Sequence, residues 1–438
     1  MGKTYRRYLP EQKLLLPPDL RDWLPDEHLA YFVGELVDEL DLGAIESRYE
    51  AETRGQPPYD PRLMVKLLVY GYSTGVRSSR KMAQRLDEDV AFRVLAAGNR
   101  PDFRTLSDFR KIHLKALEGL FEQALRLALE AGALRVGRVA LDGTKLKAAA
   151  SKHKAMSWKR LGEAERRLGR EAREILAEAA RVDEAEDARW GERRGDELPA
   201  ELARRESRLK RIREAKQALA ERARQRAAAA GEPPEKAAEA RPADKDQYNF
   251  TDPESRIMKG ADGFVQAYNA QAAVEPSCQL IVGQTLTNEA NDKRQLRPLV
   301  EAVERQAGRR PAEVLADNGY CSNANIEYLA SKDEPERAIE GWLATAKTKH
   351  NETPPAAPRG RLPRRLTPVE RMRRKLLTKA GRKIYARRKA IVEPVFGQIK
   401  QARGIRQFLL RGIEKARGEW ALICLTHNVL KMHRLATA

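Results

Sequence analysis

Apolar residues recur with helical spacing through the first third of the chain. From Leu29 to Leu40 they return every three or four positions after the acidic segment Pro25–Glu27, a pattern that predicts an amphipathic helix. Leu63–Tyr70 predicts a second helix, and Pro101 begins a third that is expected to continue towards Ala133. Several short helices with basic N-terminal regions predict a helical domain over residues 1–133, either helix-turn-helix-like and DNA-binding or an ordinary helical bundle.

After residue 134 the pattern changes to short apolar runs separated by turn residues and helices. The predicted strands are Val136–Leu141, Gly263–Val274, Gln279–Thr287, Glu313–Ala316 and Ala338–Ala346. Predicted helices cover Asn291–Gln306 and the segment from Ser322 to Ser331. This alternation predicts an α/β domain over residues 134–438.

A long helical pattern interrupts this second domain at about residues 151–245. One apolar series runs from Leu161 to Val182 and another from Leu202 to Ala223, and the polar segment Asp183–Pro199 separates them. Two long helices folded back as a hairpin are expected. Two readings stay open: an arm that contacts DNA or a partner subunit, and a solvated, charged hairpin without such a role.

The composition points to a polyanionic partner. The chain has 438 residues, a formal net charge of +20 and only 6% aromatic residues, which favours nucleic acid over a small-molecule enzyme with one large apolar pocket. The alternative is a salt-bridged helical surface. The charge is also concentrated, because residues 359–389 hold 14 lysines and arginines but one acid, Glu370.

Several classes of protein are not indicated. No run of 18 apolar residues exists, so no transmembrane helix is expected, and the N-terminus does not resemble a signal peptide. The three cysteines, Cys278, Cys321 and Cys424, are far apart and support neither a disulfide framework nor a zinc site. No phosphate-binding loop for ATP occurs, and Gly71–Gly75, although it matches Gly-x-Ser-x-Gly, follows a predicted helix and not a strand.

Three acids stand out by position. Asp142 and Asp317 each follow an apolar strand and precede or nearly precede a glycine, and Glu393 is a rare acid in a cationic helix. Carboxylates that converge in this way suit hard divalent cations, which promote phosphoryl transfer. Taken singly, each acid also has a local explanation. For Asp142 it is a turn before Gly143, and for Asp317 it is an Asx-turn. For Glu393 it is a helical salt bridge with Lys389. The strand, strand, helix order favours a shared site.

Lys389 and Lys400 lie four residues before and seven after Glu393, so one helix face is expected to carry all three. On that face the Glu393 carboxylate is expected to hold a metal ion while the two lysines hold DNA phosphates.

These motifs resemble those of bacterial insertion-sequence DDE transposases, in the insertion sequence eleven-eighty-two branch of the insertion sequence four/five-like group. The three acidic motifs are Leu141–Thr144, Ala316–Tyr320 and Val392–Lys400. Segments that resemble the family's helical front domain are Tyr59–Pro61, Tyr70–Gly75, Ser78–Arg80 and Pro101–Arg110. The likeness spans about Asp19 to Arg434.

The resemblance implies a ribonuclease H-like core with a mixed sheet flanked by helices, here interrupted by the helical hairpin. It implies two Mg²⁺ (or Mn²⁺) ions held by Asp142, Asp317 and Glu393. The family's helix often reads Tyr-x₂-Arg-x₃-Glu-x₆-Lys; Lys400 fits this spacing, whereas Lys389 takes the place of the arginine and Tyr385 lies one residue early. The expected DNA contacts are Lys389, Lys400, Arg388, Arg387, Tyr385 and Arg403.

The expected function is a transposase that cleaves the ends of an insertion sequence and joins the 3′ ends to target DNA. Alternatives are a catalytically silent DNA-binding protein and a plain metal-dependent nuclease. We expect a homodimer or a higher oligomer on DNA, no membrane association and no nucleotide cofactor. The expected location is the bacterial cytoplasm, on the nucleoid when the protein is bound to DNA.

Overall fold

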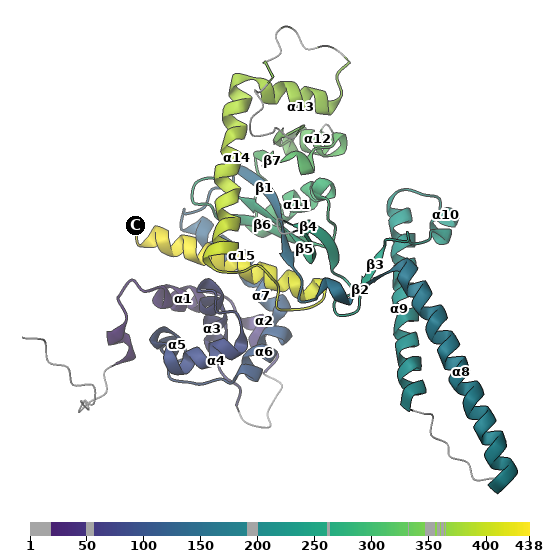
Figure 1. Cartoon of the computed structure of the whole chain (residues 1–438). Helices are drawn as coiled ribbons and strands as arrows, with labels where there is room; N and C mark the ends of the chain where they lie inside the picture. The colour runs from purple at the N-terminus through teal and green to yellow at the C-terminus, as the bar shows by residue number, and fades with distance from the viewer. Residues whose placement is uncertain are drawn as a thin grey trace, which may run out of the picture.

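The computed structural model describes residues 19–49, 57–190, 200–260, 263–331, 333–346, 355–356, 360, 363 and 365–438. It has three parts: a group of front helices, a central sheet with its covering helices, and a long arm that projects to one side (Figure 1). In the described residues the structure is mixed α/β. No described helix is both long and apolar enough to span a bilayer.

The front part is helical. Its elements are the 3₁₀ helix η1 (Leu20–Trp23), α1 (Leu29–Asp38), α2 (Gly43–Glu46), α3 (Pro61–Ser73), α4 (Ser79–Glu88), α5 (Val90–Leu95), α6 (Phe103–Ile112) and α7 (Leu114–Glu130). Side chains at the N-caps, such as Asp60 and Asp102, accept backbone hydrogen bonds at the start of α3 and α6, which explains where these helices begin. The prediction of a single helix from Pro101 to Ala133 is wrong, because the helix is interrupted at His113, between α6 and α7. The buried ring of His113 contacts the Tyr49 hydroxyl at 2.8 Å.

Gly71 and Gly75 lie in and just after α3, as the helical pattern predicted. Gly75 has φ of +82°, and a Cβ there would meet the Arg403 carbonyl oxygen at 2.8 Å. Ser73 is buried. The Gly-x-Ser-x-Gly match is therefore a packing feature of two close backbones.

A six-stranded mixed sheet forms the centre. Its strands are β1 (Arg138–Lys147), β4 (Arg256–Gly260), β5 (Gly263–Val274), β6 (Ile281–Thr287), β7 (Glu313–Ala316) and β8 (Glu340–Leu343). The order is β4-β5-β1-β7-β8, and β6 pairs with β5 beside β4. β5 is antiparallel to β1, β4 and β6, while β7 is parallel to β1 and to β8. The five strands predicted from the sequence are present with shifted ends. The strand predicted to end at Leu141 continues to Lys147, so the prediction that Asp142 follows a strand is wrong.

Helices cover this sheet. They are α11 (Leu296–Ala307), α12 (Asn323–Ala330), α13 (Pro368–Leu377), α14 (Lys379–Gly397) and α15 (Ile413–Ala436), with the 3₁₀ helices η3 (Asp292–Arg294), η4 (Asn318–Tyr320) and η5 (Pro335–Arg337) between elements. A π-helix, Gln398–Ala402, follows α14 directly. Ser322 caps α12 through Asn325 N, as predicted.

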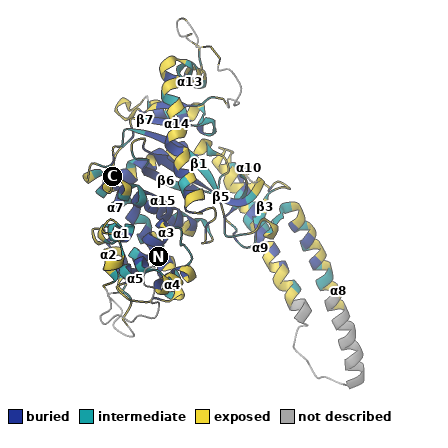
Figure 2. Ribbon diagram, turned by 60° about the vertical axis from the view of Figure 1, so that its left-hand side comes forward, coloured by how far each residue is buried: buried dark blue, intermediate teal, exposed yellow. Residues whose placement is uncertain are grey.

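One hydrophobic core joins the front helices to the sheet. The long helix α15 lies between them, packed on α3 and α7 on one side and on β6 on the other (Figure 1). Most of α15 is buried, and the dark band in Figure 2 runs from the front helices into the sheet. The division at residues 133/134 therefore marks a change of secondary structure inside a continuous core.

The arm leaves the sheet after β1. η2 (Lys152–Lys154) leads into β2 (Ala155–Ser157), which pairs with β3 (Gln247–Asn249). Beyond this pair, α8 (Trp158–Trp190) and α9 (Ala200–Ala229) pack side by side, and α10 (Pro234–Glu239) follows. A separate apolar cluster that includes Leu161, Leu168, Leu209 and Ile212 holds the two helices together. The polar break expected at Asp183–Pro199 begins later than predicted, because α8 continues to Trp190; residues 191–199 lie outside the described residues.

Candidate active site

Asp142 and Asp317 lie on neighbouring parallel strands. In the register of β1 with β7, Leu141 pairs with Ala316, so the two acids are the next residues along two adjacent strands. Asp317 also caps η4, accepting a hydrogen bond from Gly319 N at 2.7 Å, and Asp142 accepts one from Gly143 N at 2.8 Å. The local prediction for Asp317 is therefore confirmed, whereas the turn predicted at Asp142 and Gly143 is wrong, because both residues lie within the continuous strand β1.

Burial makes this carboxylate pair electrostatically unusual. Desolvation raises the pKa of Asp142 to about 6; the Arg388 guanidinium opposes the shift, and the Asp317 charge adds to it. Arg388 Nη1 lies 3.3 Å from Asp142 Oδ2. A half-buried carboxylate whose neighbour is another carboxylate favours a cation between them.

Helix α14 supplies that cation. Arg388 is only 6% exposed and faces Asp142. Tyr385, one helical turn earlier, is half-buried beside Arg388, and burial raises the pKa of its hydroxyl while Arg388 opposes the shift. The Tyr-x₂-Arg spacing is thus Tyr385 and Arg388, whereas Lys389 is exposed. Lys389, at the arginine spacing counted from Glu393, is exposed, and the buried Arg388 holds a carboxylate where a DNA contact was expected.

Glu393 follows Arg388 by five residues on α14. Its side chain is exposed, and five residues of helix turn it about 140° away from the direction of Arg388. Within the part of the chain that the structure describes, no group of three or more His, Cys, Asp or Glu side chains is arranged to hold a metal ion. The structure thus brings together two of the three predicted acids.

Lys400 contacts β1 next to Asp142. Its Nζ donates to Thr144 Oγ1 and to the Lys145 carbonyl, the latter at 3.2 Å. Lys389 and Glu393 are both exposed and four residues apart in α14, as expected for one face. The prediction that Lys400 shares this face is wrong, because Lys400 lies in the π-helix that follows and contacts β1.

Arg403 is buried far from solvent. Its guanidinium donates to the Tyr72 carbonyl at 2.9 Å, to the Ile423 carbonyl at 3.2 Å and to Thr426. Burial lowers the pKa of Arg403 to about 9. The prediction that Arg403 contacts DNA does not agree with this position, where the side chain joins α3 to α15.

Asp292, which the sequence analysis did not single out, lies beside the pair. Its Oδ1 accepts hydrogen bonds from Asn269 Nδ2 at 2.7 Å and Gln271 Nε2 at 2.8 Å, and from Lys145 at 3.3 Å. A Cβ added at Gly319 would lie 2.9 Å from Asp317 Oδ1 and 3.3 Å from Asp292 Oδ2. Both carboxylates therefore lie close to Gly319.

The packing behind this acid pair is polar and close. A Cβ at Gly143 would meet Asn269 Oδ1 and Asp292 Oδ1, each at 3.0 Å. The Gln271 side-chain oxygen accepts a hydrogen bond from the hydroxyl of the fully buried Tyr320, and its Nε2 donates one to Asp292. The sequence signal for this network was the polar residues Asn269 and Gln271 inside an otherwise apolar buried strand, since a buried amide needs polar partners.

Exposed cations surround the site on α13 and α14. They are Arg371, Arg373, Lys379, Arg382, Lys383, Arg387 and Lys389. Of the predicted DNA contacts, Arg387 and Lys389 are thus accessible, while Arg388 and Arg403 are not. Part of the basic segment before Arg365 lies outside the described residues.

Two segments match models of known families. Residues 18–112 match the model described as Transposase domain (DUF772), and residues 362–433 match the Transposase DDE domain. No curated protein and no solved structure matches the chain. The matches support a DDE transposase of a mobile element, and DNA as its partner. The second segment contains Glu393 and Lys400, whereas Asp142 and Asp317 lie outside both segments.

Proposed function

We propose that this protein cleaves the ends of an insertion sequence and joins the 3′ ends to target DNA by metal-dependent phosphoryl transfer. The observation that carries the proposal is the position of Asp142, within β1, beside Asp317, directly after the neighbouring parallel strand β7. The two transposase matches, before and after these strands, support it. We place the protein in the bacterial cytoplasm, as a dimer or higher oligomer on DNA.

The sheet supports a ribonuclease H-like core. If β4, which pairs only with the first part of β5, is set aside, the order is β6-β5-β1-β7-β8. Counted along the chain, Asp142 then lies on the first strand and Asp317 follows the fourth. Along the chain, the arm is inserted between β1 and β5, the first and second of these five strands. This arrangement agrees with the strand and acid order that the resemblance implies.

The residues present fit a divalent ion at the aspartate pair. Asp142 and Asp317 offer the hard oxygen donors that Mg²⁺ and Mn²⁺ prefer, and their burial leaves negative charge that Arg388 only partly balances. Such an ion stabilises charge on the phosphoryl oxygens. We assign Glu393 as the third carboxylate, for two ions in all, on the resemblance and on its place in the matched segment.

Other side chains act through position and charge. Arg388 holds the Asp142 carboxylate, and Lys400 lies against β1 where a DNA phosphate next to Asp142 comes within its reach. Asp292 is a positioning residue, because it ties Asn269 and Gln271 of β5 to the two strand ends. Arg387 and Lys389 hold the DNA backbone from the exposed face of α14.

The test is Mg²⁺-dependent cleavage and strand transfer on DNA that contains the inverted repeats flanking the gene. Asp142→Ala, Asp317→Ala and Glu393→Ala are each expected to lower the rate about 100-fold or more, since each removes a carboxylate of the metal site. Asp292→Asn keeps the shape but removes the charge, and about a tenfold loss is expected.

Glu414→Ala is the matched control, because Glu414 is 80% exposed on α15. If the three alanine variants all retain activity, the assignment of the site is wrong. Cleavage without joining by the wild-type chain would instead establish a metal-dependent nuclease, and DNA binding with no product in Mg²⁺ or Mn²⁺ a catalytically silent protein.

A further inference from the structure

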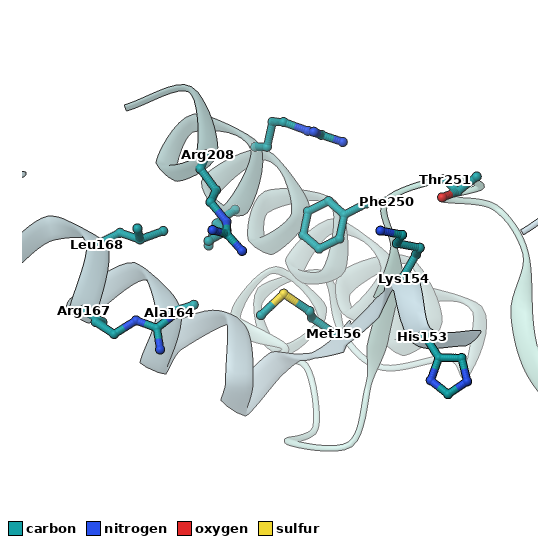
Figure 3. Close-up of a pocket in the computed structure, with 11 residues that line it drawn as sticks. His153, Lys154, Met156, Ala164, Arg167, Leu168, Arg208, Phe250 and Thr251 are labelled. Atoms are coloured by element: carbon teal, nitrogen blue, oxygen red, sulfur yellow. The ribbon is translucent and has the colours of Figure 1, made fainter. Parts of the chain in front are cut away.

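A basic pocket lies at the root of the arm, away from the aspartate pair. It has a volume of about 530 Å³ and is formed by η2, β2, α8, α9 and the segment after β3. Its lining residues are His153, Lys154, Met156, Ala164, Arg167, Leu168, Arg208, Arg211, Ile212, Phe250 and Thr251. Figure 3 shows the Phe250 ring above Met156, with Arg208 and Lys154 on either side.

The charged residues that line the pocket are all basic. Three arginines, a lysine and a histidine line the pocket, and none of its lining residues is an acid. The floor is apolar, because Met156 and Phe250 pack on the cluster of Leu168 and Ile212. The Arg211 guanidinium lies 5.7 Å from the centroid of the Phe250 ring. The pocket therefore offers cations at its rim and an aromatic surface inside.

Both features suit a nucleotide unit of DNA. Phosphates bind cationic side chains, and a base stacks on an aromatic ring once it has left its own stack. The volume lies within the range of pockets that hold small organic groups. A second copy of this chain is a poorer occupant, because each copy carries a net charge of +20 and like charges repel.

The pocket is also close along the chain to the candidate active site. His153 follows Asp142 by 11 positions in the chain, so the two are at most about 40 Å apart. Lys145, Lys147 and Lys152 lie along this segment, and Lys400 contacts it. A DNA strand rises 3.4 Å per nucleotide, so about 12 nucleotides are enough to cover the distance.

We propose that the pocket at the root of the arm binds an unpaired nucleotide of the DNA on which the proposed transposase acts, within about 12 nucleotides of the cleaved bond. Arg208, Arg211 and Lys154 hold its flanking phosphates, and Phe250 stacks on the base. This proposal rests on the proposed function for the identity of the DNA, but its test does not depend on catalysis.

The experiment measures binding by fluorescence anisotropy at constant salt, without divalent metal. The probes are a duplex with a five-nucleotide single-stranded overhang containing 2-aminopurine, and the same sequence fully paired. The double variant Arg208→Glu, Arg211→Glu is expected to bind the overhang probe about tenfold or more weakly. Phe250→Leu, which keeps the apolar volume, is expected to remove the change in 2-aminopurine fluorescence and about fivefold or more of the preference for the overhang.

Lys210→Glu is the matched control, because Lys210 is exposed on α9 between the two arginines in sequence but does not line the pocket. It is expected to weaken binding much less. Thermal unfolding of each variant verifies that the arm is folded. Wild-type binding by the double variant, or an equal loss in Lys210→Glu, overturns the proposal; so does a change in oligomeric state with unchanged DNA binding.

The two proposals fail in different ways. If Asp142→Ala abolishes cleavage while the pocket variants bind DNA like the wild type, only the pocket proposal is wrong. If the pocket variants lose overhang binding but the wild-type chain yields neither cleavage nor joining, only the proposed reaction is wrong.

Discussion

At the scale of single residues, the site holds a carboxylate in an environment that disfavours its charge. Burial and the neighbouring Asp317 outweigh the favourable contact with Arg388, and the pKa of Asp142 rises to about 6. In an unfolded chain the same group ionises near pH 4. The ionised Asp142 carboxylate destabilises the folded protein, and a bound cation would offset this cost. The stability of the protein and its metal affinity at this site are therefore linked.

The sign of this linkage is testable without any activity assay. Between about pH 4 and pH 6 the folded protein keeps a proton on Asp142 that the unfolded chain has lost, so this group's contribution to stability falls as the pH rises, by about 3 kcal/mol in all. Asp142→Asn is expected to remove that contribution. Urea unfolding at pH 4.5 and pH 7, without metal, measures the difference between the variant and the wild type.

Asp108→Asn, an exposed acid on α6, is the control and is expected to change the pH dependence little. Adding Mg²⁺ is expected to stabilise the wild type more at pH 7 than at pH 5, because the ion binds the ionised carboxylates. An identical pH dependence in the wild type and Asp142→Asn contradicts the raised pKa.

At the scale of elements, the direction of α14 decides which side chains reach the aspartates. α13 ends at Leu377, Thr378 caps α14, and the two helices meet at a close corner. A Cβ at Gly381 would lie 2.9 Å from Leu376 Cα and closer still to the Lys375 carbonyl oxygen. These are backbone atoms, which cannot move aside as a side chain can, so the corner fixes the angle at which Arg388 approaches β1.

Gly381→Ala therefore tests the corner. The added methyl group is expected to cost about 1–3 kcal/mol of folding free energy through overpacking and to weaken the alignment of Arg388 with Asp142. Gly397→Ala is the matched control in the same helix: no neighbouring group lies within 4 Å of its Cβ, and an alanine is expected to be neutral or to stabilise by about 0.5–1 kcal/mol. Chemical denaturation of both variants measures the contrast, and equal stabilities refute the role of the corner.

At the scale of the whole molecule, a buried polar network joins the front helices to the sheet. Glu419 of α15 accepts hydrogen bonds from Leu409 N at 2.8 Å and Leu410 N at 3.0 Å, and contacts Arg77 and the Tyr72 hydroxyl at 3.3 Å each. Its carboxylate is buried, and desolvation raises its pKa while these donors oppose the shift. Together with the shared apolar core, this network couples the two halves of the chain.

Glu419→Ala is expected to destabilise the protein by about 3–5 kcal/mol, because it leaves buried donors and the Arg77 charge without their acceptor. In the wild type, circular dichroism and tryptophan fluorescence are expected to report one unfolding transition for the front helices and the sheet. Glu414→Ala, on the same helix but exposed, is expected to change stability by less than about 0.5 kcal/mol. A stability loss no larger than that of Glu414→Ala shows that the network does not join the halves.

Local pattern by itself determined most of the elements and the place of two acids beside them. The apolar runs before Asp142 and Asp317 predict strands, because alternation and turn chemistry act over a few residues. Asp317 follows its strand, whereas β1 continues through Asp142 to Lys147. The same local reasoning placed the front helices and the concentration of charge before Glu393.

Only the tertiary structure decided which side chains meet. Arg388 and Lys389 are adjacent in sequence, but helix rotation buries one against Asp142 and exposes the other. Asp292 and Arg403 show no sequence signal of their positions, because their partners come from segments 20 to 331 residues away. A contact depends on how distant elements pack, and packing is a property of the whole core, not of any short stretch of the chain.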